Sequence, residues 1–163
     1  MTEWTYASMW ESIAAAIPDK PAIVQQDKVM SWQEFDRSAN GLSTYLVDAG
    51  LGRQAKVAVY ARNCPEYLIG IYAAFKASLV PFNVNYRYGN EELAYLFENG
   101  DAEAVLFETV YADKIDAIRG RLPGVKLWIA VERAGYPIPH WAVSYTDIAA
   151  ADSPPTGKRP RSS

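Results

Sequence analysis

Histidine and cysteine, whose side chains often act in catalysis or metal binding, each occur once in this sequence. His140 is the only histidine, between Pro139 and Trp141, and Cys64 is the only cysteine. A zinc site needs several His or Cys ligands at defined spacing, so neither residue predicts one. An imidazole can serve as an acid or base and a thiol as a nucleophile. We favour an ordinary loop position for His140 and a capping or half-buried position for Cys64.

Cys64 directly precedes Pro65, where the pattern predicts the start of a helix. The positive end of a helix dipole lowers the pKa of a thiol. The sequence therefore predicts a lowered pKa for Cys64. No histidine lies near it in the sequence to activate it as a nucleophile.

Two short segments have residue types that can bind ligands. Tyr86, Arg87 and Tyr88 follow the end of a predicted strand, where parallel sheets usually bind ligands. The alternative, which we favour, is a surface loop whose rings cover the sheet edge. The segment 156–158 (TGK) resembles the end of a phosphate-binding loop, but the first glycine of that motif is missing. A flexible basic linker explains it better.

The sequence singles out no pair of acidic residues for catalysis. Glu91 and Glu92 suit the positive end of a helix, and Asp113 and Asp116 suit a solvated helix face. We therefore assign no catalytic, cofactor-binding or metal-binding residue from the sequence.

The first 50 residues predict a helix, a hairpin and a second helix. Apolar spacing favours a helix over 5–17, before Pro18, and two short apolar runs flank a turn at 26–28. Ser31 and Glu34 have the capping-box spacing, and Gly50 can end the helix that begins there.

From residue 56 onward, short β-rich runs alternate with helical patterns, which is typical of βαβ units. The sequence predicts an α/β fold: a largely parallel sheet with helices on both faces, preceded by a helix and a β-hairpin. Pro65 suits the first turn of its helix, and Asn90 can cap the next one. The predicted strands are 57–61, 79–84, 104–107 and 127–131; the predicted helices are 65–77, 91–99, 110–122 and 145–150.

Composition and charge exclude several classes of protein. The 163 residues are 50% hydrophobic with one cysteine, which excludes a disulfide-stapled or disordered chain. Residues 1–151 contain 13 basic and 18 acidic residues, so we expect no nucleic-acid partner. We see no secretion signal and no apolar stretch of about 20 residues. We expect a cytoplasmic protein that is not integral to a membrane.

We expect two regions: an N-terminal α/β portion over 1–151 and a basic Pro/Ser-rich linker or tail over 152–163. The last twelve residues contain Lys158, Arg159 and Arg161 among three prolines and no apolar pattern.

The order of several motifs resembles the opening of fatty-acyl-CoA synthetases, which are adenylate-forming, AMP-binding ligases. The resemblance covers about residues 9–107 and weakens beyond them. Gln54 and Ser78 stand where the family usually has glycine, so we expect altered turns there and no lost chemistry. The matching segments are MSWQEFD at 30–36, AGLG at 49–52, KVAVYARN at 56–63, PEY at 65–67, FKA at 75–77, VPFN at 80–83 and NEELAYL at 90–96.

The resemblance implies ATP, magnesium and CoA for a full-length enzyme that forms an acyl-adenylate and then an acyl-CoA. It also implies a phosphate loop, downstream nucleotide motifs and a mobile domain with an essential lysine, none of which is in these 163 residues. The resemblance therefore implies the N-terminal part of the large domain of the adenylate-forming fold. We expect a truncated scaffold that binds none of these cofactors and is inactive alone. In some relatives a cation near the position of Lys114 contacts CoA, but no clear motif supports this residue, and we leave it out of the sites.

Two other hypotheses stay open at this point. The chain can be a freestanding, non-catalytic α/β module that binds a partner or a lipid. It can also be a small flavodoxin-like nucleotide enzyme, which we disfavour because no glycine-rich turn follows a predicted strand. If the chain is a fragment, its partner is the rest of the ligase, and its uncovered apolar surface should promote self-association.

Overall fold

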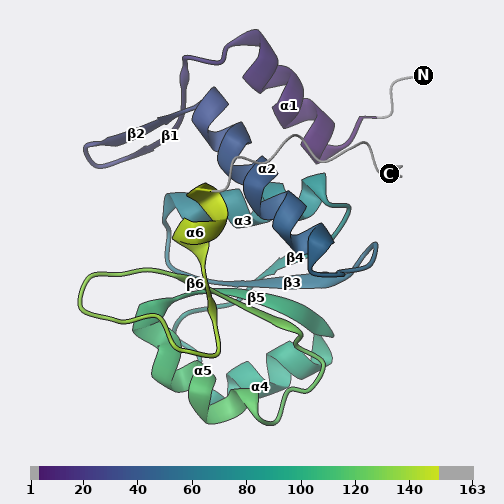
Figure 1. Ribbon diagram of the computed structural model, residues 1–163, viewed down its shortest axis with the longest axis vertical. Coiled ribbons are helices and arrows are strands. Elements are labelled where there is room, and N and C mark those ends of the chain that lie inside the picture. Colours follow the sequence, from purple (N-terminus) through teal and green to yellow (C-terminus); the bar gives the residue numbers. More distant parts are fainter. Residues whose placement is uncertain (1–3, 151–163) are drawn as a thin grey trace.

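The structure is a computed structural model that describes residues 4–150. Its centre is a five-stranded sheet in the order β4-β3-β5-β6-β7, with every pairing parallel (Figure 1). A two-stranded antiparallel hairpin, β1 with β2, lies outside this sheet. The strands are β1 (Pro21–Gln25), β2 (Lys28–Ser31), β3 (Lys56–Tyr60), β4 (Val80–Asn83), β5 (Ala102–Glu108), β6 (Leu127–Val131) and β7 (Val143–Ser144).

The helices are α1 (Tyr6–Ala16), α2 (Trp32–Asp48), α3 (Pro65–Lys76), α4 (Asn90–Asn99), α5 (Ala112–Arg119) and α6 (Tyr145–Ala150). Helices α2, α3 and α6 cover one face of the sheet, and α4 and α5 cover the other (Figure 1). The predicted α/β class and the leading helix and hairpin are confirmed. Within residues 4–150, none of the helices combines the length and apolarity needed to cross a membrane.

The alternation of side chains along the strands produces two cores. Val57 and Val59 of β3 lie on the side of the sheet covered by α2 and α3, and Ala58 and Tyr60 lie on the side covered by α4 and α5. Both faces are therefore apolar, as is usual for a parallel sheet covered by helices on both sides.

The two ends of α2 are formed as the sequence predicts. The Ser31 amide donates to Glu34 Oε2 at 2.8 Å, and the Glu34 amide donates to Ser31 Oγ at 3.2 Å. After the last turn, Gly50 has a φ of 87°, a backbone conformation that glycine adopts at little cost. The capping box at the start and Gly50 after the end therefore determine where this helix begins and ends.

Three local expectations need correction. Asn90 is the first residue of α4 and not its cap; Gly89 occupies the cap position, and its amide donates to Glu92 Oε2. The helix expected over 110–122 is shorter than predicted. A 3₁₀ turn (Thr109–Tyr111) connects β5 to α5, and α5 ends at Arg119. Strand β7 was not predicted, since two residues are too short for a periodic pattern. The expected tail at 152–163 lies outside the described residues.

Gln54 and Ser78, where the resemblance leads one to expect glycine, both have left-handed backbone, with φ of 63° and 58°. This conformation is costly for a residue that has a Cβ atom. The turns are therefore of a kind that favours glycine, although larger residues occupy them.

Lys76, at the C-terminal end of α3, is buried and joins the three helices nearest the N-terminus. Its Nζ lies 2.8 Å from Glu11 Oε1 of α1 and 2.7 Å from Asp36 Oδ1 of α2. The Tyr72 hydroxyl also donates to Asp36 Oδ1. These bonds fix α1 and α2 on α3, which packs directly on the sheet.

Candidate functional site

The strand order places a crevice at the carboxyl ends of β3 and β5. After β3 the chain moves to one side to form β4 and then crosses to the other side to form β5. The connections that leave β3 and β5 therefore diverge, and ligands of open α/β sheets usually bind at such a point. Arg62 lies two residues beyond β3, and Glu108 is the last residue of β5.

Arg62 and Glu108 are joined across this crevice by three hydrogen bonds. The Arg62 backbone amide and Nε donate to Glu108 Oε1 at 2.7 and 3.3 Å, and Nη2 donates to Oε2 at 3.2 Å. The Glu108 side chain is 2% exposed, whereas the Arg62 side chain is 52% exposed. The carboxylate is thus fixed inside the fold, and the guanidinium group reaches the surface.

Arg133, two residues beyond β6, extends this pair into a four-residue network. Its Nε donates to Glu108 Oε2 at 2.7 Å, and its Nη2 donates to Glu66 Oε2 at 3.1 Å. Burial raises the pKa of the Glu108 carboxyl, but the hydrogen bonds from Arg62 and Arg133 outweigh it, so the pKa lies below its ordinary value. The network of Arg62, Glu108, Arg133 and Glu66 holds two positive and two negative charges.

This network forms part of the wall of a pocket of about 990 Å³ at the carboxyl edge, which we call the carboxyl-edge pocket. Its other walls come from the β1–β2 hairpin, the start of α3 and helix α6. Gln25 of the hairpin donates through Nε2 to the Asn63 carbonyl oxygen at 2.6 Å. Further lining residues include Ile23, Lys28, Met30, Ser38, Ile69, Tyr145 and Thr146.

Cys64 also lines this pocket, but the predicted lowering of its pKa is wrong. It occupies the N-cap position of α3 without a side-chain capping bond. Burial raises the pKa of its thiol to about 11, and the nearby Glu66 carboxylate adds to the effect. Desolvation outweighs the influence of the Tyr67 backbone amide, which acts to lower the pKa, so the geometry supports the half-buried role and gives no activated nucleophile.

Tyr86, Arg87 and Tyr88 lie at the carboxyl end of β4 and are not members of the network, although Tyr111, the ring partner of Tyr86, interacts electrostatically with Arg62 and Glu108. The Tyr86 ring stacks on Tyr111 with centroids 6.5 Å apart, and the Arg87 guanidinium lies 5.6 Å from the Tyr86 ring centroid. Lys114 of α5 donates through Nζ to the Tyr88 carbonyl oxygen at 3.0 Å. These contacts fix the loop between β4 and α4 against the 3₁₀ turn and α5.

The remaining candidates are dispersed. His140 is exposed in the connection between β6 and β7, away from the carboxyl-edge pocket. Glu91 pairs with Arg121 at 2.7 Å, and Asp116 pairs with Arg119 at 2.7 Å. The segment 156–158 lies outside the described residues.

The donor set of the carboxyl-edge pocket does not suit magnesium. The carboxylates of Glu66 and Glu108 both accept hydrogen bonds from guanidinium groups, whereas magnesium prefers unengaged oxygen ligands in octahedral geometry. Within residues 4–150, no group of three or more His, Cys, Asp or Glu side chains is arranged to hold a metal ion. We derive no chemical step through magnesium at this pocket.

Sequence reasoning missed all four residues of the network. Arg62 and Glu108 are 46 residues apart, and Arg133 is a further 25 residues along the chain. One signal could have found three of them: each is the first or second charged position at the carboxyl end of a predicted strand, and those ends meet at one edge of a parallel sheet.

The fold and this pocket define a parallel α/β protein. Its crevice lies between the carboxyl ends of β3 and β5, where the connections leave in opposite directions, which is called the topological switch point of the sheet. Residues 10–160 match the model of the AMP-binding enzyme family, and the chain belongs to this family. No glycine-rich turn follows β3, where residues 61–64 are ARNC, in contrast to dinucleotide-binding folds.

The chain is similar to curated fatty-acid CoA ligases over a part of their length. It is 35% identical over 126 residues to the medium/long-chain-fatty-acid–CoA/3-oxocholest-4-en-26-oate–CoA ligase of Mycobacterium marinum, which covers 77% of this chain and 23% of that protein. It is 31% identical over 166 residues to the medium-chain acyl-CoA ligase Mig of Mycobacterium avium, covering 93% of this chain and 30% of the relative. The chain therefore spans about a quarter to a third of these relatives.

Among solved structures, acetoacetyl-CoA synthetase from Streptomyces lividans superposes with a TM-score of 0.83. The identity is 20%, and the match covers 92% of this chain and 25% of that chain. At this identity the likeness shows the fold, which agrees with the expected N-terminal part of the adenylate-forming fold.

Proposed function

We propose that this chain is the N-terminal scaffold of a medium- or long-chain fatty-acid CoA ligase. In the whole enzyme, ATP would activate the fatty acid as an acyl-adenylate, and CoA would then take the acyl group. Membership of the AMP-binding family and the 35% and 31% identities to fatty-acid CoA ligases support this function. The expected division into an α/β portion over 1–151 and a basic linker over 152–163 belongs to the same proposal.

We further propose that the chain alone catalyses neither adenylation nor thioester formation. Adenylation requires a carboxylate held in line with the α-phosphorus while cations and hydrogen-bond donors absorb negative charge. The observation that carries this proposal is the network at the switch point, where Arg62 and Arg133 are already bonded to Glu108 and Glu66. A triphosphate would have to displace these carboxylates, one of which is buried, to use either cation.

The experiment is ATP–pyrophosphate exchange with decanoate and magnesium, using the purified chain and a heat-treated control. We expect equal rates in the two samples. Exchange clearly above the control would refute the proposed inactivity. A full-length ligase of the family, assayed in parallel, verifies that the conditions support adenylation.

The reading frame beyond Ser163 separates the scaffold from a freestanding binding module. An in-frame Thr/Gly-rich loop soon after this position supports the scaffold. A stop codon at this position supports the module.

The scaffold proposal includes self-association through uncovered apolar surface. Val24 and Val29 lie opposite each other on the hairpin and are 66% and 60% exposed. A two-stranded ribbon with such a pair on its outer side has apolar area for another part of a protein to cover. Sedimentation velocity over a range of concentrations tests this: we expect association that Val24→Asp weakens. A monomer at all concentrations would contradict it.

A further inference from the structure

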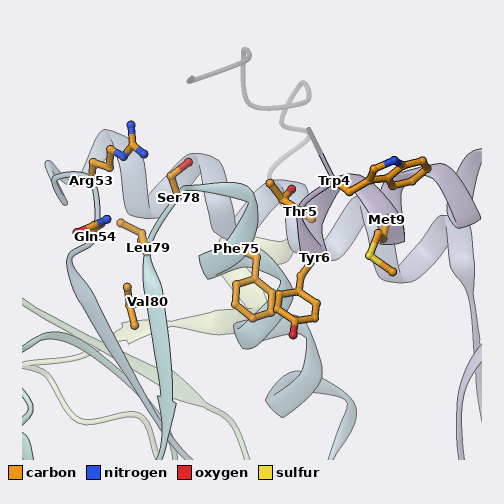
Figure 2. A pocket seen from close by; sticks show the side chains of 11 residues that line it. Trp4, Thr5, Tyr6, Met9, Arg53, Gln54, Phe75, Ser78, Leu79 and Val80 are labelled. Atoms are coloured by element: carbon orange, nitrogen blue, oxygen red, sulfur yellow. The ribbon is translucent and has the colours of Figure 1, made fainter. Parts of the chain in front are cut away.

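The hollow where β3 and β4 begin has no unpaired charge among the described residues that line it. Figure 2 shows its polar side at Arg53, across from the exposed side chains of Trp4 and Met9. Arg53 already has an interaction partner, and the other described lining residues have no formal charge. This hollow therefore lacks a charge that would select one class of ligand.

A pocket of a different character lies beside β7, the edge strand of the sheet. It has a volume of about 720 Å³, and we call it the α2–α6 pocket. Its walls come from the C-terminal half of α2, the connection between β6 and β7, and the first residues of α6. Tyr45, Ile138, Val143 and Ile148 give it an apolar lining. None of its described lining residues belongs to the carboxyl-edge pocket, so the two pockets are separate.

Two carboxylates line the α2–α6 pocket without a positive partner. Asp48 and Asp147 are both exposed, and the described lining residues include no lysine or arginine. Within residues 4–150, neither carboxylate forms a hydrogen bond or an ion pair; the bond at Asp147 is donated by its backbone amide to Ser144 Oγ. The charge of this pocket therefore favours a cationic occupant.

The position of Asp48 points in the same direction. Asp147 lies in the first turn of α6, where a carboxylate suits the positive end of the helix dipole. Asp48, in contrast, is the last residue of α2, and the last turn of this helix has no basic residue. A carboxylate at the negative end of a helix dipole is unfavourable unless a cation lies nearby. The end of α2 thus lacks a cation that its electrostatics call for.

The chain has a segment of complementary charge directly after α6. Residues 152–163 contain Lys158, Arg159 and Arg161 and one acidic residue, Asp152. They also contain three prolines, which favour the extended polyproline II conformation. Proline-rich segments bind in grooves with aromatic and apolar walls, because they lose little conformational entropy on binding. Both the charge and the composition of this segment match the α2–α6 pocket.

The length of the connection allows the segment to reach the pocket. Ala150 is the last residue of α6, and Asp147 and Ile148 of the same helix line the pocket. The eight residues from Ala150 to Lys158 span about 25 Å in the polyproline II conformation. This length exceeds the width of a 720 Å³ hollow, so the cations of the segment can approach either carboxylate.

We propose that segment 152–163 docks in the α2–α6 pocket, with its prolines against Tyr45 and Ile138 and its cations at Asp48 and Asp147. The docked segment fixes where the chain leaves the α/β body, beside β7. This inference goes beyond the proposed scaffold function and makes no use of ATP, CoA or a fatty acid. Its failure leaves that function untouched, and the reverse also holds.

Weak contacts are sufficient for docking, because the segment is attached to the body that it binds. A short flexible connection gives an effective concentration of about 1 mM. An intrinsic dissociation constant of about 0.1 mM would then keep the segment docked about nine-tenths of the time. Two exposed ion pairs, each weak alone, together with proline rings on an apolar wall can supply this affinity.

The test is limited proteolysis of the full chain with trypsin at pH 8 and low salt, followed by mass spectrometry. Trypsin cuts after Lys158 and Arg161, and the reference is a synthetic peptide of residues 151–163, which has no pocket in which to dock. We expect cleavage at these two bonds to be about tenfold slower in the chain than in the peptide. Sodium chloride at about 0.5 M should reduce this protection, because it screens exposed charges.

Asp48→Asn combined with Asp147→Asn should bring the cleavage rate to within about twofold of the peptide, because two exposed ion pairs are lost. Ile138→Ser should also weaken protection, because it removes apolar surface. The matched control is Asp101→Asn combined with Asp113→Asn, which removes the same charge from two exposed positions after α4 and in α5. The control should keep the full protection. Circular dichroism of each variant verifies the fold before proteolysis.

Equal cleavage rates in the chain and the peptide would overturn the proposal, because the pocket would then be left for another partner. Protection that persists when both Asp48 and Asp147 are replaced would also overturn it, because the segment would then dock elsewhere. Docking within one molecule predicts protection that is independent of protein concentration. Protection that increases with concentration would show that the segment of a second copy is the occupant, and would overturn the proposal as well.

Discussion

The backbone amide of Gln54 donates to the carbonyl oxygen of Ser78 over 2.8 Å, and both residues have left-handed backbone. This bond joins the turn before β3 to the turn before β4, and the Val80 amide continues the pairing to Ala55 O at 3.0 Å. The register of the two strands is therefore set by two turns that both favour glycine.

We expect Ser78→Gly to stabilise the chain by about 1 kcal/mol, because a left-handed residue with a Cβ atom costs about that much. The change also removes the buried hydroxyl group that has no partner in the described residues. Urea unfolding, followed by circular dichroism, measures the free energy of unfolding. Ser12→Gly on the exposed side of α1 is the control, and it should destabilise the helix by roughly 0.5 kcal/mol. A loss of stability in Ser78→Gly would contradict the prediction.

Much of the fold was predictable because its signals are local. The capping box at Ser31, the proline that begins α3 and the alternation of strands with helices each depend on residues close together in the sequence. These signals identify the elements and the parallel sheet. They fail for β7, whose two residues form a strand by pairing with Ile129 and Ala130 of β6, more than ten residues away in the sequence.

The candidate site was not predictable in the same way, because it depends on contacts between distant segments. Arg62, Glu66, Glu108 and Arg133 meet only after three strands have aligned. Cys64 shows the same limit: its neighbours in the sequence predict a lowered pKa, whereas the burial caused by the surrounding fold raises it. Local sequence patterns contain no direct measure of desolvation.

Gly70 allows α3 to approach the sheet closely, and we expect Gly70→Ala to be destabilising. Alanine stabilises a helix by about 1 kcal/mol relative to glycine. The added Cβ, however, would lie 2.6 Å from Leu106 Cδ2 in the core. Overpacking costs about 1–3 kcal/mol, so the net loss should be about 1 kcal/mol. The free energy of unfolding in urea checks this value.

Gly120→Ala, at the end of α5, is the matched control. Nothing lies within 4 Å of its added Cβ, and the residue has helical backbone. It should be neutral or slightly stabilising. If Gly70→Ala and Gly120→Ala both raise the free energy of unfolding, the added Cβ at Gly70 does not clash with Leu106.

The thiol of Cys64 should be unreactive in the folded chain. With its pKa raised to about 11, the thiolate fraction at pH 8 is small, and alkylation by iodoacetamide should be about a hundredfold slower than for free cysteine. The rate should rise steeply with pH above 8 and should recover in urea at pH 8. Mass spectrometry of the labelled chain gives the rate, and Cys64→Ser gives the background. A rate close to that of free cysteine at pH 8 would show that the thiol is not desolvated.

Glu108 should make the stability of the chain depend on pH in the acidic range. Because its folded-state pKa is lowered, the ionised carboxylate stabilises the fold above the unfolded-state value of about 4.3. This contribution is lost as the pH falls through the folded-state pKa. Glu108→Gln should lower the free energy of unfolding by about 2 kcal/mol at pH 7. This loss is smaller than that expected for a fully buried ion pair, because the Arg62 side chain is half exposed.

The difference in unfolding free energy between the unmodified chain and Glu108→Gln should therefore shrink between pH 5 and the lowest pH at which both still fold. Urea titrations across this range measure it. Glu103→Gln is the control, because Glu103 forms an ion pair at the surface with Lys126, and it should change stability by less than about 1 kcal/mol at pH 7. A difference for Glu108→Gln that stays constant down to pH 3 would mean that the two guanidinium groups do not stabilise the ionised form, and the network at the switch point would lose its electrostatic basis.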